Sequence, residues 1–594
     1  MALARTLRRG AASAALHRRG GPEGGAVLLS LPAVLLLLGA LVGPLAILLA
    51  YSVGLLGDDT PLGLSRYAEV LTDGFYLGVL GSTLRLGALV TAATLALGYP
   101  LAWAVAQARG RRRTLLLAIV IAPLLTNILV RTLGWVVILD DNGILNAALR
   151  AVSGGHLSQR FLGTDVGITI ALTHVFLPFM VLPMLTTLER IAPSLRESAA
   201  VYGAHPVVVF WRVILPLSVP GILAGATLVF LLATGALLTP LIVGQGRVWV
   251  LPTLIYEQIQ LVHWGRAAAL AVTLFGASLL AILLSQWLGQ RLAGSYARGA
   301  PGGLARAWAQ VGGELGVRLC AALRGAPTFA RGLRLAGQGF VALVLLYLLF
   351  PLGVVIKTAF DASPVIQAGF GGFTLRWFEA LFADSRYLDA LLLSLRLALL
   401  TAVVDLALGI PAAHALVRGS FPGRGPLLAF LLSPLLIPHM VLAIGLVLYF
   451  QALGAGPSFL RLLVVHLVIA LPYVVRILVT AFQSVDPRLE ESAHTLGASR
   501  LTVLRRVTLP LVKPALFAAM LFSFLVSFDE ATITVLVAGA GNVTLPVRIF
   551  SQLTQQWTAA VAALSTIWIA WTLLMLVIIE RLVGLSAFGT ERQA

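Results

Sequence analysis

Twelve long apolar runs are the feature that most limits how this chain can fold. About 20 apolar residues cross a bilayer as a helix. Only 11% of the residues are charged, against roughly 25% in a soluble protein. The sequence therefore predicts an all-α polytopic membrane protein surrounded by a lipid bilayer. The runs lie near residues 27–51, 83–107, 114–137, 167–188, 219–242, 267–290, 337–358, 390–416, 426–451, 462–482, 514–537 and 558–583.

The basic N-terminus is similar to that of a secretory signal peptide, because arginines from Arg5 to Arg19 precede an apolar run. The run from Val27 to Tyr51 is about 25 residues long, however, which exceeds the apolar core of a signal peptide and suffices to span a membrane. We therefore interpret it as a retained first span.

Charge predicts the orientation of the spans. Arginine-rich loops alternate with acidic loops, and Lys and Arg concentrate on the cytoplasmic side of membrane proteins. We therefore expect a multi-pass inner-membrane protein with both termini in the cytoplasm. The net charge of +18 follows from this topology, so no nucleic-acid partner is expected. The arginine-rich loops are 5–19, 109–113, 190–212, 291–334, 418–424 and 488–513, and the acidic loops contain Asp58, Asp59, Asp73, Asp140, Asp141, Asp361 and Asp384.

The chain contains an internal duplication of six spans plus six. Gly98-Tyr99-Pro100 is echoed by Gly409-Ile410-Pro411 at an offset of 311 residues, and Leu177-Pro178 by Leu471-Pro472 at an offset of 294. The first half thus has about 17 extra residues, which we place between Asp140 and Asp165. Two halves of equal span number and orientation form parallel repeats, and the transport pathway is expected at their pseudo-two-fold interface. The predicted parts are a basic tail (1–26), a first six-helix domain (27–290), a cytoplasmic linker (291–336) and a second six-helix domain (337–594).

Two polar stretches recur within this duplication at the offset of 294 residues. The first, within 189–217, contains Glu197, Ala199, Gly203 and Pro216, and the second, within 483–511, contains Glu491, Ala493, Gly497 and Pro510. Each is predicted to form a short helix, a break and a second helix. Ser194, in a capping box with Glu197, and Asp486 are the expected N-terminal caps. Gly203 and Gly497 can adopt the left-handed conformation that ends a helix.

A short exposed helix with small residues on one face suits docking in a groove of another protein. A single copy is equally well explained as a loop helix that connects two spans. Two copies at fixed spacing, each followed by an L-P-x-x-x-P step, favour docking.

Both stretches resemble the EAA motif of the permeases of ATP-binding-cassette (ABC) importers, and the likeness covers nearly the whole chain outside the tail and the linker. The resemblance implies the type I importer permease fold, with two parallel six-helix repeats. It also implies that a periplasmic substrate-binding protein delivers the substrate and that a cytoplasmic ATPase dimer docks on the two motifs. The ATPase-coupling residues would be Glu197, Ala199, Gly203, Pro216, Glu491, Ala493, Gly497 and Pro510.

The two halves resemble the two permease subunits of spermidine/putrescine importers, here joined in one chain. Arg131-Thr132-Leu133-Gly134-Trp135 carries the likeness in the first half and Ser527-Phe528-Asp529-Glu530 in the second. The resemblance implies a polyamine as the substrate. Related permeases carry ferric iron, thiamine, sulfate or aminoethylphosphonate, and fused permeases are familiar in the iron, thiamine and phosphonate branches. These substrates therefore stay open as alternatives.

No motif for catalysis is present. The chain's two lysines, Lys357 and Lys513, follow Ile356 and Val512, so neither belongs to a phosphate-binding loop. H-E-x-x-H is absent, no plausible G-x-S-x-G triad is evident, and the lone Cys320 excludes a cysteine-rich metal site. We expect no catalytic residue, metal or cofactor in this chain, and ATP to be hydrolysed by a partner subunit.

Carboxylates within the predicted spans are candidates for the substrate pathway, because charges in lipid are costly. Asp529 and Glu530 lie roughly 22 Å from the cytoplasmic end of their span, at about 1.5 Å per residue. Adjacent residues of a helix point about 100° apart, so we expect one carboxylate in the pathway and the other paired with a neighbour. A purely structural pair with a residue such as Arg476 is the alternative. Asp405 is a further candidate, with helix packing as its alternative.

Three tryptophans, Trp135, Trp249 and Trp264, lie near the outer ends of spans, where aromatic side chains commonly anchor in the interface. Trp135 is retained as a tentative pathway residue that stacks on the ligand.

Two other classes of protein fit less well. A secondary transporter also uses duplicated bundles, but it gives no reason for two matched polar stretches on the cytoplasmic side. A membrane enzyme or scaffold needs clustered catalytic side chains at one face, and the sequence contains none. Co-purification of an ATPase distinguishes the importer from the secondary transporter.

Overall fold

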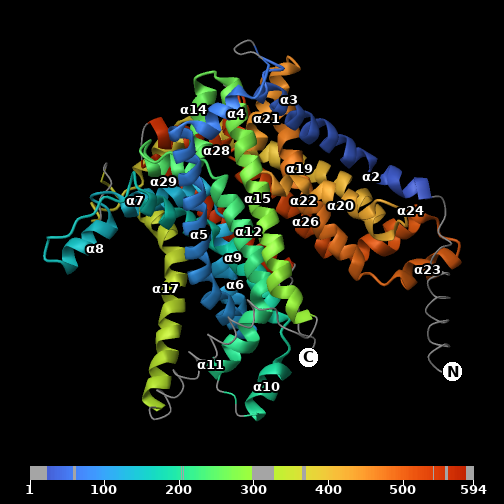
Figure 1. The fold of residues 1–594 in the computed structure, drawn as a ribbon, viewed down its shortest axis with the longest axis horizontal. Helices are drawn as coiled ribbons and strands as arrows, with labels where there is room; N and C mark the ends of the chain where they lie inside the picture. Colours follow the sequence, from blue (N-terminus) through green and yellow to red (C-terminus); the bar gives the residue numbers. More distant parts are fainter. Residues whose placement is uncertain are drawn as a thin grey trace. The chain divides into compact units, whose positions relative to one another are not determined.

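The computed structural model is built of helices (Figure 1) and describes residues 23–57, 62–202, 204, 206–297, 327–363, 369–539, 541–555 and 559–582. Among these residues the β-structure is limited to one isolated bridge, between Asp361 and Phe373. Eight of the described helices are long and apolar enough to cross a membrane, or eleven when each of three bent pairs counts as one span. The last predicted run, 558–583, corresponds to α29 (Ala560–Leu582). The predicted all-α polytopic fold is confirmed.

Helix boundaries repeat between the halves. The first half contains α2 (Glu23–Leu37), the π-helix η1 (Leu38–Val42), α3 (Gly43–Ser52), α4 (Ser65–Thr72), α5 (Gly74–Gln107), α6 (Gly110–Leu124), α7 (Ile128–Leu139), α8 (Ile144–Val152), α9 (Asp165–Glu189), α10 (Pro193–Val201), α11 (Pro206–Val209), the π-helix η2 (Phe210–Ile214), α12 (Leu215–Thr234), α13 (Leu238–Gly244), α14 (Leu251–Gln260) and α15 (Trp264–Ala297).

The second half contains α17 (Pro327–Ala359), α18 (Arg376–Ala383), α19 (Ser385–Arg418), α20 (Arg424–Leu432), the 3₁₀ helix η3 (Ser433–Leu436), α21 (His439–Ala452), α22 (Phe459–Ser484), α23 (Pro487–Thr495), α24 (Arg500–Val503), the π-helix η4 (Leu504–Thr508), α25 (Leu509–Leu511), α26 (Lys513–Asp529), α27 (Thr534–Val537), α28 (Leu545–Gln555) and α29. Helices α5 and α19 have the same length, 34 residues, and matching ends. The additional residues of the first half include α8, which has no counterpart between α21 and α22.

Two predicted spans are bent near their middle. The run 114–137 is divided into α6 and α7, with a bend of 92° between α6 and the segment Ile128–Val152, and the run 426–451 bends by 96° before α21. At the second bend Pro438 favours the extended conformation of the preceding residue, Ile437, and so ends the helix there. At the first bend the side chain of Asn127 accepts a hydrogen bond from the N–H of Leu129 (2.8 Å) and so caps α7.

The runs 219–242 and 514–537 are not continuous helices, contrary to the expectation from their hydropathy. Helix α12 ends at Thr234 and α26 ends at Asp529, and in each half a short helix, α13 or α27, follows the break. The 100° separation expected between Asp529 and Glu530 assumed an unbroken helix and is therefore wrong.

The ends of the linker expected over 291–336 are helical, because α15 continues to Ala297 and α17 begins at Pro327. Residues 298–326, Cys320 included, lie outside the described residues, as do residues 1–22 and 583–594 at the two termini.

The chain divides into two compact units that do not coincide with the two halves. Unit 1 comprises residues 1–47, 390–437 and 445–544, and unit 2 comprises residues 48–389, 438–444 and 545–594. Each unit therefore contains helices from both halves.

Unit 1 includes the first span of the first half among helices of the second half. A side chain at Gly43 would lie 2.8 Å from the ring of Tyr449, and one at Gly445 would lie 3.2 Å from the carbonyl oxygen of Pro44. Glycine at these positions allows α3 and α21 to approach closely.

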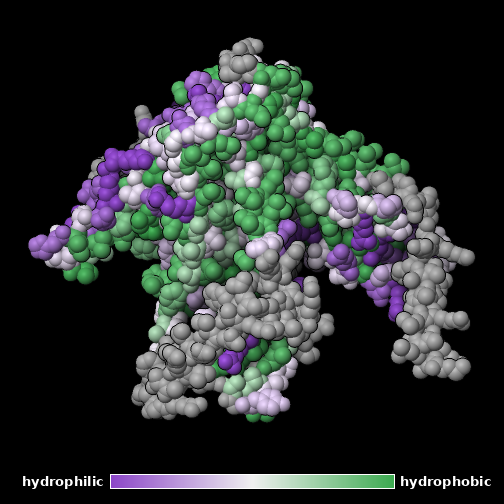
Figure 2. All heavy atoms as spheres, viewed as in Figure 1, coloured by the Kyte–Doolittle hydropathy of each residue, from purple (hydrophilic) through white to green (hydrophobic). Residues whose placement is uncertain are grey.

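Unit 2 includes the first and last spans of the second half, α17 and α29, among helices of the first half. Helix α17 packs against α5, α6, α7 and α29, and the hydroxyl of Thr572 donates a hydrogen bond to the carbonyl oxygen of Leu125 (3.2 Å). Apolar side chains cover the outward flank of α15 (Figure 2), where Leu280, Leu283 and Leu284 are exposed. An exposed apolar band of this kind suits contact with lipid.

Candidate functional site

The second polar stretch forms the helix α23 with a cap at each end. Asp486 accepts a hydrogen bond from the N–H of Arg488 (3.0 Å), and Pro487 occupies the first turn. At the other end Gly497 has φ of 86°. Its N–H donates to His494 O (2.9 Å), and the N–H of Ala498 donates to Ala493 O (3.1 Å). This is a Schellman motif, and it confirms that Gly497 ends the helix in the left-handed conformation.

The first polar stretch forms the equivalent helix α10. The N–H of Ala204 donates to Ala199 O (2.9 Å), which matches the bond between Ala498 and Ala493. Gly203 itself lies outside the described residues. Helix α10 begins at Pro193, so Ser194 lies within its first turn, and the capping box predicted for Ser194 is wrong.

Both short helices expose apolar side chains at matching positions. Tyr202 and Leu496, which are equivalent, are 90% and 88% exposed. The equivalent pair Leu195 and Leu489 is also exposed, as are the carboxylates of Glu197 and Glu491. Large apolar side chains on an otherwise polar surface are typical of a contact with another protein.

The prolines at positions 216 and 510 follow a widened helical turn. The π-helices η2 and η4 end one residue before Leu215-Pro216 and Leu509-Pro510, respectively. Because proline lacks an N–H and crowds the carbonyl four residues before it, the preceding turn is displaced from α-helical bonding. Pro216 and Pro510 thus mark, in both halves, the point where the polar stretch joins the next span.

Sequence reasoning missed an anchor of α23. The guanidinium of Arg418, at the end of α19, donates to Glu490 (Nε–Oε2 2.7 Å) and to the carbonyl of Val485 (3.0 Å). The hydroxyl of Thr508 also donates to Glu490 Oε1 (2.8 Å). Both members of the ion pair are largely buried. Helix α23 is therefore joined to α19 and to the start of the following span.

The break after α26 places its two carboxylates in different environments. Glu530 is buried, and its Oε1 accepts a hydrogen bond from the N–H of Ile533 (2.7 Å), just before α27. Asp529 is the last residue of α26 and is only half-buried. In the first half, Gly235 and Ala236 occupy these positions, so the two breaks differ chemically.

His466 links the two sides of this break. From the middle of α22, its Nδ1 lies 2.7 Å from Ser527 Oγ on α26, and its Nε2 lies 3.1 Å from Thr534 Oγ1 on α27. His466 is buried. A histidine within an apolar run was the only sequence signal for this role.

Asp405 and Trp135 both lie in buried packing positions. Asp405 is fully buried on α19 and accepts a hydrogen bond from Ser523 Oγ on α26 (2.7 Å). Trp135 is 5% exposed, and its ring contacts those of His174 (5.7 Å between centroids) and Tyr347 (5.2 Å). Arg476 is exposed on α22.

Two cavities lie around the short helices α13 and α14. Helix α14 is at the end of unit 2 opposite α10 (Figure 1). The smaller, about 230 Å³, is lined by residues that include Trp249, Tyr256 and Glu257. The larger, about 560 Å³, is lined by residues that include Asp140, Tyr256 and Phe550. Tyr256 lines both cavities, and its ring contacts that of Phe550 edge-on (6.4 Å, 83°).

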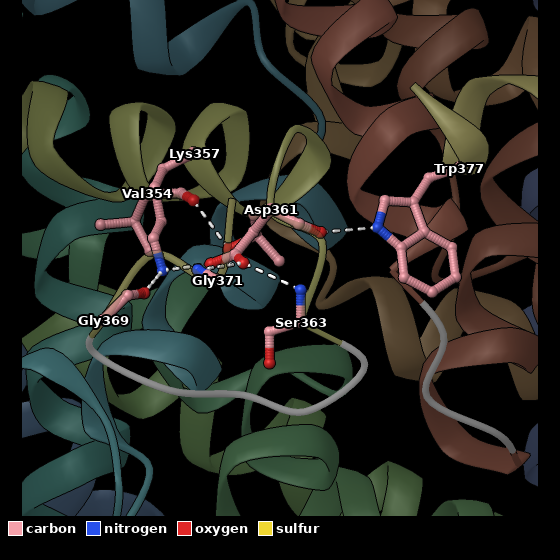
Figure 3. A network of polar contacts seen from close by, with 8 residues as sticks. Val354, Lys357, Asp361, Ser363, Gly369, Gly371 and Trp377 are labelled. Atoms are coloured by element: carbon pink, nitrogen blue, oxygen red, sulfur yellow. Dashed lines mark hydrogen bonds and ion pairs between the residues drawn. The ribbon is translucent and has the colours of Figure 1, made fainter. Parts of the chain in front are cut away.

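A loop after α17 is closed by a polar network centred on Asp361 (Figure 3). Its Oδ2 lies 2.7 Å from Lys357 Nζ, and its Oδ1 accepts hydrogen bonds from the N–H groups of Ser363 and Gly371 (both 2.9 Å). Trp377 Nε1 donates to Asp361 O (2.8 Å). Burial raises the pKa of Asp361, but Lys357 and the two N–H donors lower it by more, so the pKa lies below its ordinary value.

Among the described residues, no group of three or more His, Cys, Asp and Glu side chains is arranged to hold a metal ion.

Comparison with known proteins identifies the family. The model of the binding-protein-dependent transport system inner membrane component matches the chain twice, at residues 94–294 and 405–584. The chain belongs to this family. It is an inner-membrane permease of the ABC importer class, with two copies of the permease domain in one chain, and its family is one of transport proteins, not of enzymes.

Single-domain relatives match about two fifths of this permease. It is 32% identical to the spermidine/putrescine transport system permease protein PotC of Haemophilus influenzae over 41% of this chain and 93% of the relative. It is 34% identical to PotB of Escherichia coli over 39% of this chain and 83% of the relative. A solved chain of a bacterial ABC transporter involved in the import of alginate covers 43% of the permease and 96% of its own length. Its TM-score of 0.34 and identity of 16% are too low to support an argument.

Proposed function

We propose that this permease imports polyamines such as spermidine and putrescine, driven by a separate cytoplasmic ATPase dimer. The observation that carries the proposal is the identity of 32% and 34% to two spermidine/putrescine permease subunits over most of their lengths. In this proposal a periplasmic binding protein delivers the polyamine. The chain binds no cofactor of its own, and both termini lie in the cytoplasm.

Helices α10 and α23 are the proposed docking sites for the ATPase. Their support is the pair of matched, exposed apolar tips at Tyr202 and Leu496, flanked by Glu197 and Glu491. Ala199 and Ala493 supply the small face and the C-terminal hydrogen bonds. Gly497, Pro216 and Pro510 set the direction of the chain into the next span, and Gly203, which is equivalent to Gly497 in the sequence, is a proposed coupling residue as well.

Asp529 is the proposed pathway carboxylate. It is half-buried at a helix break, and non-helical backbone at membrane depth is tolerated where it is buried in protein or lines a water-filled cavity. Glu530, by contrast, accepts a local backbone hydrogen bond, so we assign it a structural role. The burial of Asp405 and Trp135 favours packing for both.

The test is ATPase stimulation in nanodiscs with the cognate ATPase and binding protein. The panel contains putrescine, spermidine, ferric iron, thiamine and aminoethylphosphonate. A polyamine is expected to stimulate ATP hydrolysis, and Asp529→Asn is expected to lower this stimulation about tenfold, or ~1.4 kcal/mol. Asp141→Asn, an exposed carboxylate at the end of α7, is the control. If aminoethylphosphonate stimulates ATP hydrolysis and Asp529→Asn leaves this stimulation unchanged, both the proposed substrate and the proposed pathway residue are wrong.

A further inference from the structure

The rings of Tyr256 and Phe550 are in contact, and the two residues occupy equivalent positions in the two halves of the chain. The residues are equivalent, because each follows the matched Leu-Pro pair that begins α14 or α28. When a residue touches its own counterpart across a two-fold relation, the contact lies on or beside the axis. Tyr256 lines both cavities and Phe550 lines the larger. Both cavities therefore adjoin a contact between equivalent residues of the two halves.

Each cavity has a carboxylate in its wall. Glu257 lines the smaller cavity and Asp140 the larger, and both side chains are half-buried. Within the described part of the chain, no ion pair includes either residue. The described lining residues also include no lysine or arginine. Asp140 Oδ1 accepts one hydrogen bond, from the N–H of Asn142 (3.0 Å). Partly desolvated carboxylates without a basic partner favour a cation.

The remaining walls suit an alkyl chain that carries ammonium groups. Trp249 and Tyr256 present aromatic rings to the smaller cavity, and Tyr256 and Phe550 to the larger. Aromatic faces attract ammonium groups and also pack against methylene groups. Side-chain amides of Gln260 and Gln245 add hydrogen-bond acceptors. The larger volume, about 560 Å³, lies within the usual range for small-molecule sites, roughly 300–1,000 Å³.

We propose that the two cavities form one two-chamber site for a linear polycation. One ammonium group binds Glu257 beside Trp249, a second binds Asp140 beside Phe550, and the connecting chain lies along Tyr256. The inference rests on the proposed polyamine function and adds residues of unit 2 that bind the substrate. Sequence reasoning overlooked Glu257 and Tyr256, because α14 is a short helix between spans.

The first experiment measures uptake of radiolabelled spermidine into proteoliposomes that contain the complete complex. Glu257→Gln and Asp140→Asn are each expected to lower uptake efficiency at least tenfold, and the double variant is expected to lower it further. Asp141→Asn is the matched control, because it removes the adjacent carboxylate, which lines neither cavity, and it should leave uptake unchanged. Equal amounts of each variant in the membrane are verified by immunoblot.

The second experiment detects occupancy without transport. In a Cys320→Ser background, Gln260→Cys and Thr554→Cys place one thiol in the smaller and one in the larger cavity. Spermidine is expected to slow the labelling of both thiols by a cationic methanethiosulfonate, and the cationic reagent is expected to react faster than a neutral one. A cysteine at Asp141→Cys should not be protected.

The outcomes separate this inference from the proposed function. If the wild type imports spermidine while both carboxylate variants do so equally well and neither thiol is protected, the two-chamber site is wrong and the polyamine function stands. If the wild type imports no polyamine, the proposed substrate is wrong. In that case, if the cationic reagent labels the two thiols no faster than the neutral reagent does, the proposed cation site is wrong as well.

Discussion

At the scale of single residues, buried polar groups hold the non-helical segments in place. Asp361 illustrates this best, because four of its contacts close one loop: the ion pair to Lys357, two N–H donors to its carboxylate and the Trp377 donor to its carbonyl. The first half has a comparable contact, in which Arg66 donates to the carbonyl of Tyr51 (2.6 Å). Arg66 and Trp377 are equivalent positions of α4 and α18.

The ionisation of Asp361 predicts a pH dependence. The pKa of Asp361 is lower in the folded protein than in the unfolded chain. Its carboxylate therefore stabilises the folded protein fully when the pH is above the ordinary pKa of aspartate, about 3.9. This stabilisation is lost as the pH falls through the lower folded value. Asp361→Asn is expected to reduce stability by about 1–3 kcal/mol near neutral pH, and the difference from the wild type should shrink in acid. Thermal unfolding in detergent between pH 3 and 7 measures both. Glu379→Gln, on the exposed face of α18, is the control, and a pH-independent difference for Asp361→Asn would refute the ionic role.

His466 predicts a second effect at this scale. His466→Phe leaves the buried hydroxyls of Ser527 and Thr534 without their imidazole partner. Each buried hydroxyl left without a hydrogen-bond partner lowers the free energy of unfolding by about 1–3 kcal/mol. We therefore expect a lower unfolding temperature and slower polyamine uptake. His156→Phe, at an exposed loop position, should change neither, and normal uptake by His466→Phe would show that the break does not depend on His466.

At the scale of elements, the end of α23 carries the sharpest prediction. Gly497 has a positive φ with open space around it, so backbone conformation and not crowding restricts the position. A β-branched residue is strained there, whereas asparagine tolerates this conformation. We expect Gly497→Val to remain in the membrane but to lose substrate-stimulated ATPase activity at least tenfold. Gly497→Asn should retain it. Normal transport by Gly497→Val would contradict the coupling role of this turn.

The Arg418–Glu490 pair joins α19 to α23 and can be tested by charge exchange. Arg418→Glu and Glu490→Arg should each destabilise the protein and uncouple ATP hydrolysis from transport, and the double variant should recover part of both. The wild type, the two single variants and the double variant form a double-mutant cycle, from which we expect a coupling energy of about 0.5–3 kcal/mol between Arg418 and Glu490. Arg386→Gln, which breaks the exposed pair with Asp384, should leave both readouts unchanged. If the effect of the double variant equals the sum of the two single effects, the Arg418–Glu490 pair does not anchor α23.

At the scale of the whole molecule, each compact unit needs both halves of the chain. Unit 1 contains the first span with residues 390–437 and 445–544, and unit 2 contains α17, α28 and α29 with the later helices of the first half. A chain cut within the linker should therefore form a functional permease when both pieces are expressed together. Either piece alone should be degraded, because spans would lack their packing partners. Immunoblots of membranes and spermidine uptake measure this, and stable accumulation of the first half alone would contradict it.

Sequence alone predicted the features that each segment carries within itself. Apolar runs of span length, the offset between the halves and the short helices ending at Gly497 depend on hydropathy and local backbone preference, so a linear pattern reveals them. The tertiary structure decided the exchange of first spans, the break after Asp529, the link through His466 and the meeting of Tyr256 with Phe550. These features depend on which side chains meet after folding, across separations of tens to hundreds of residues, and no local pattern encodes that choice.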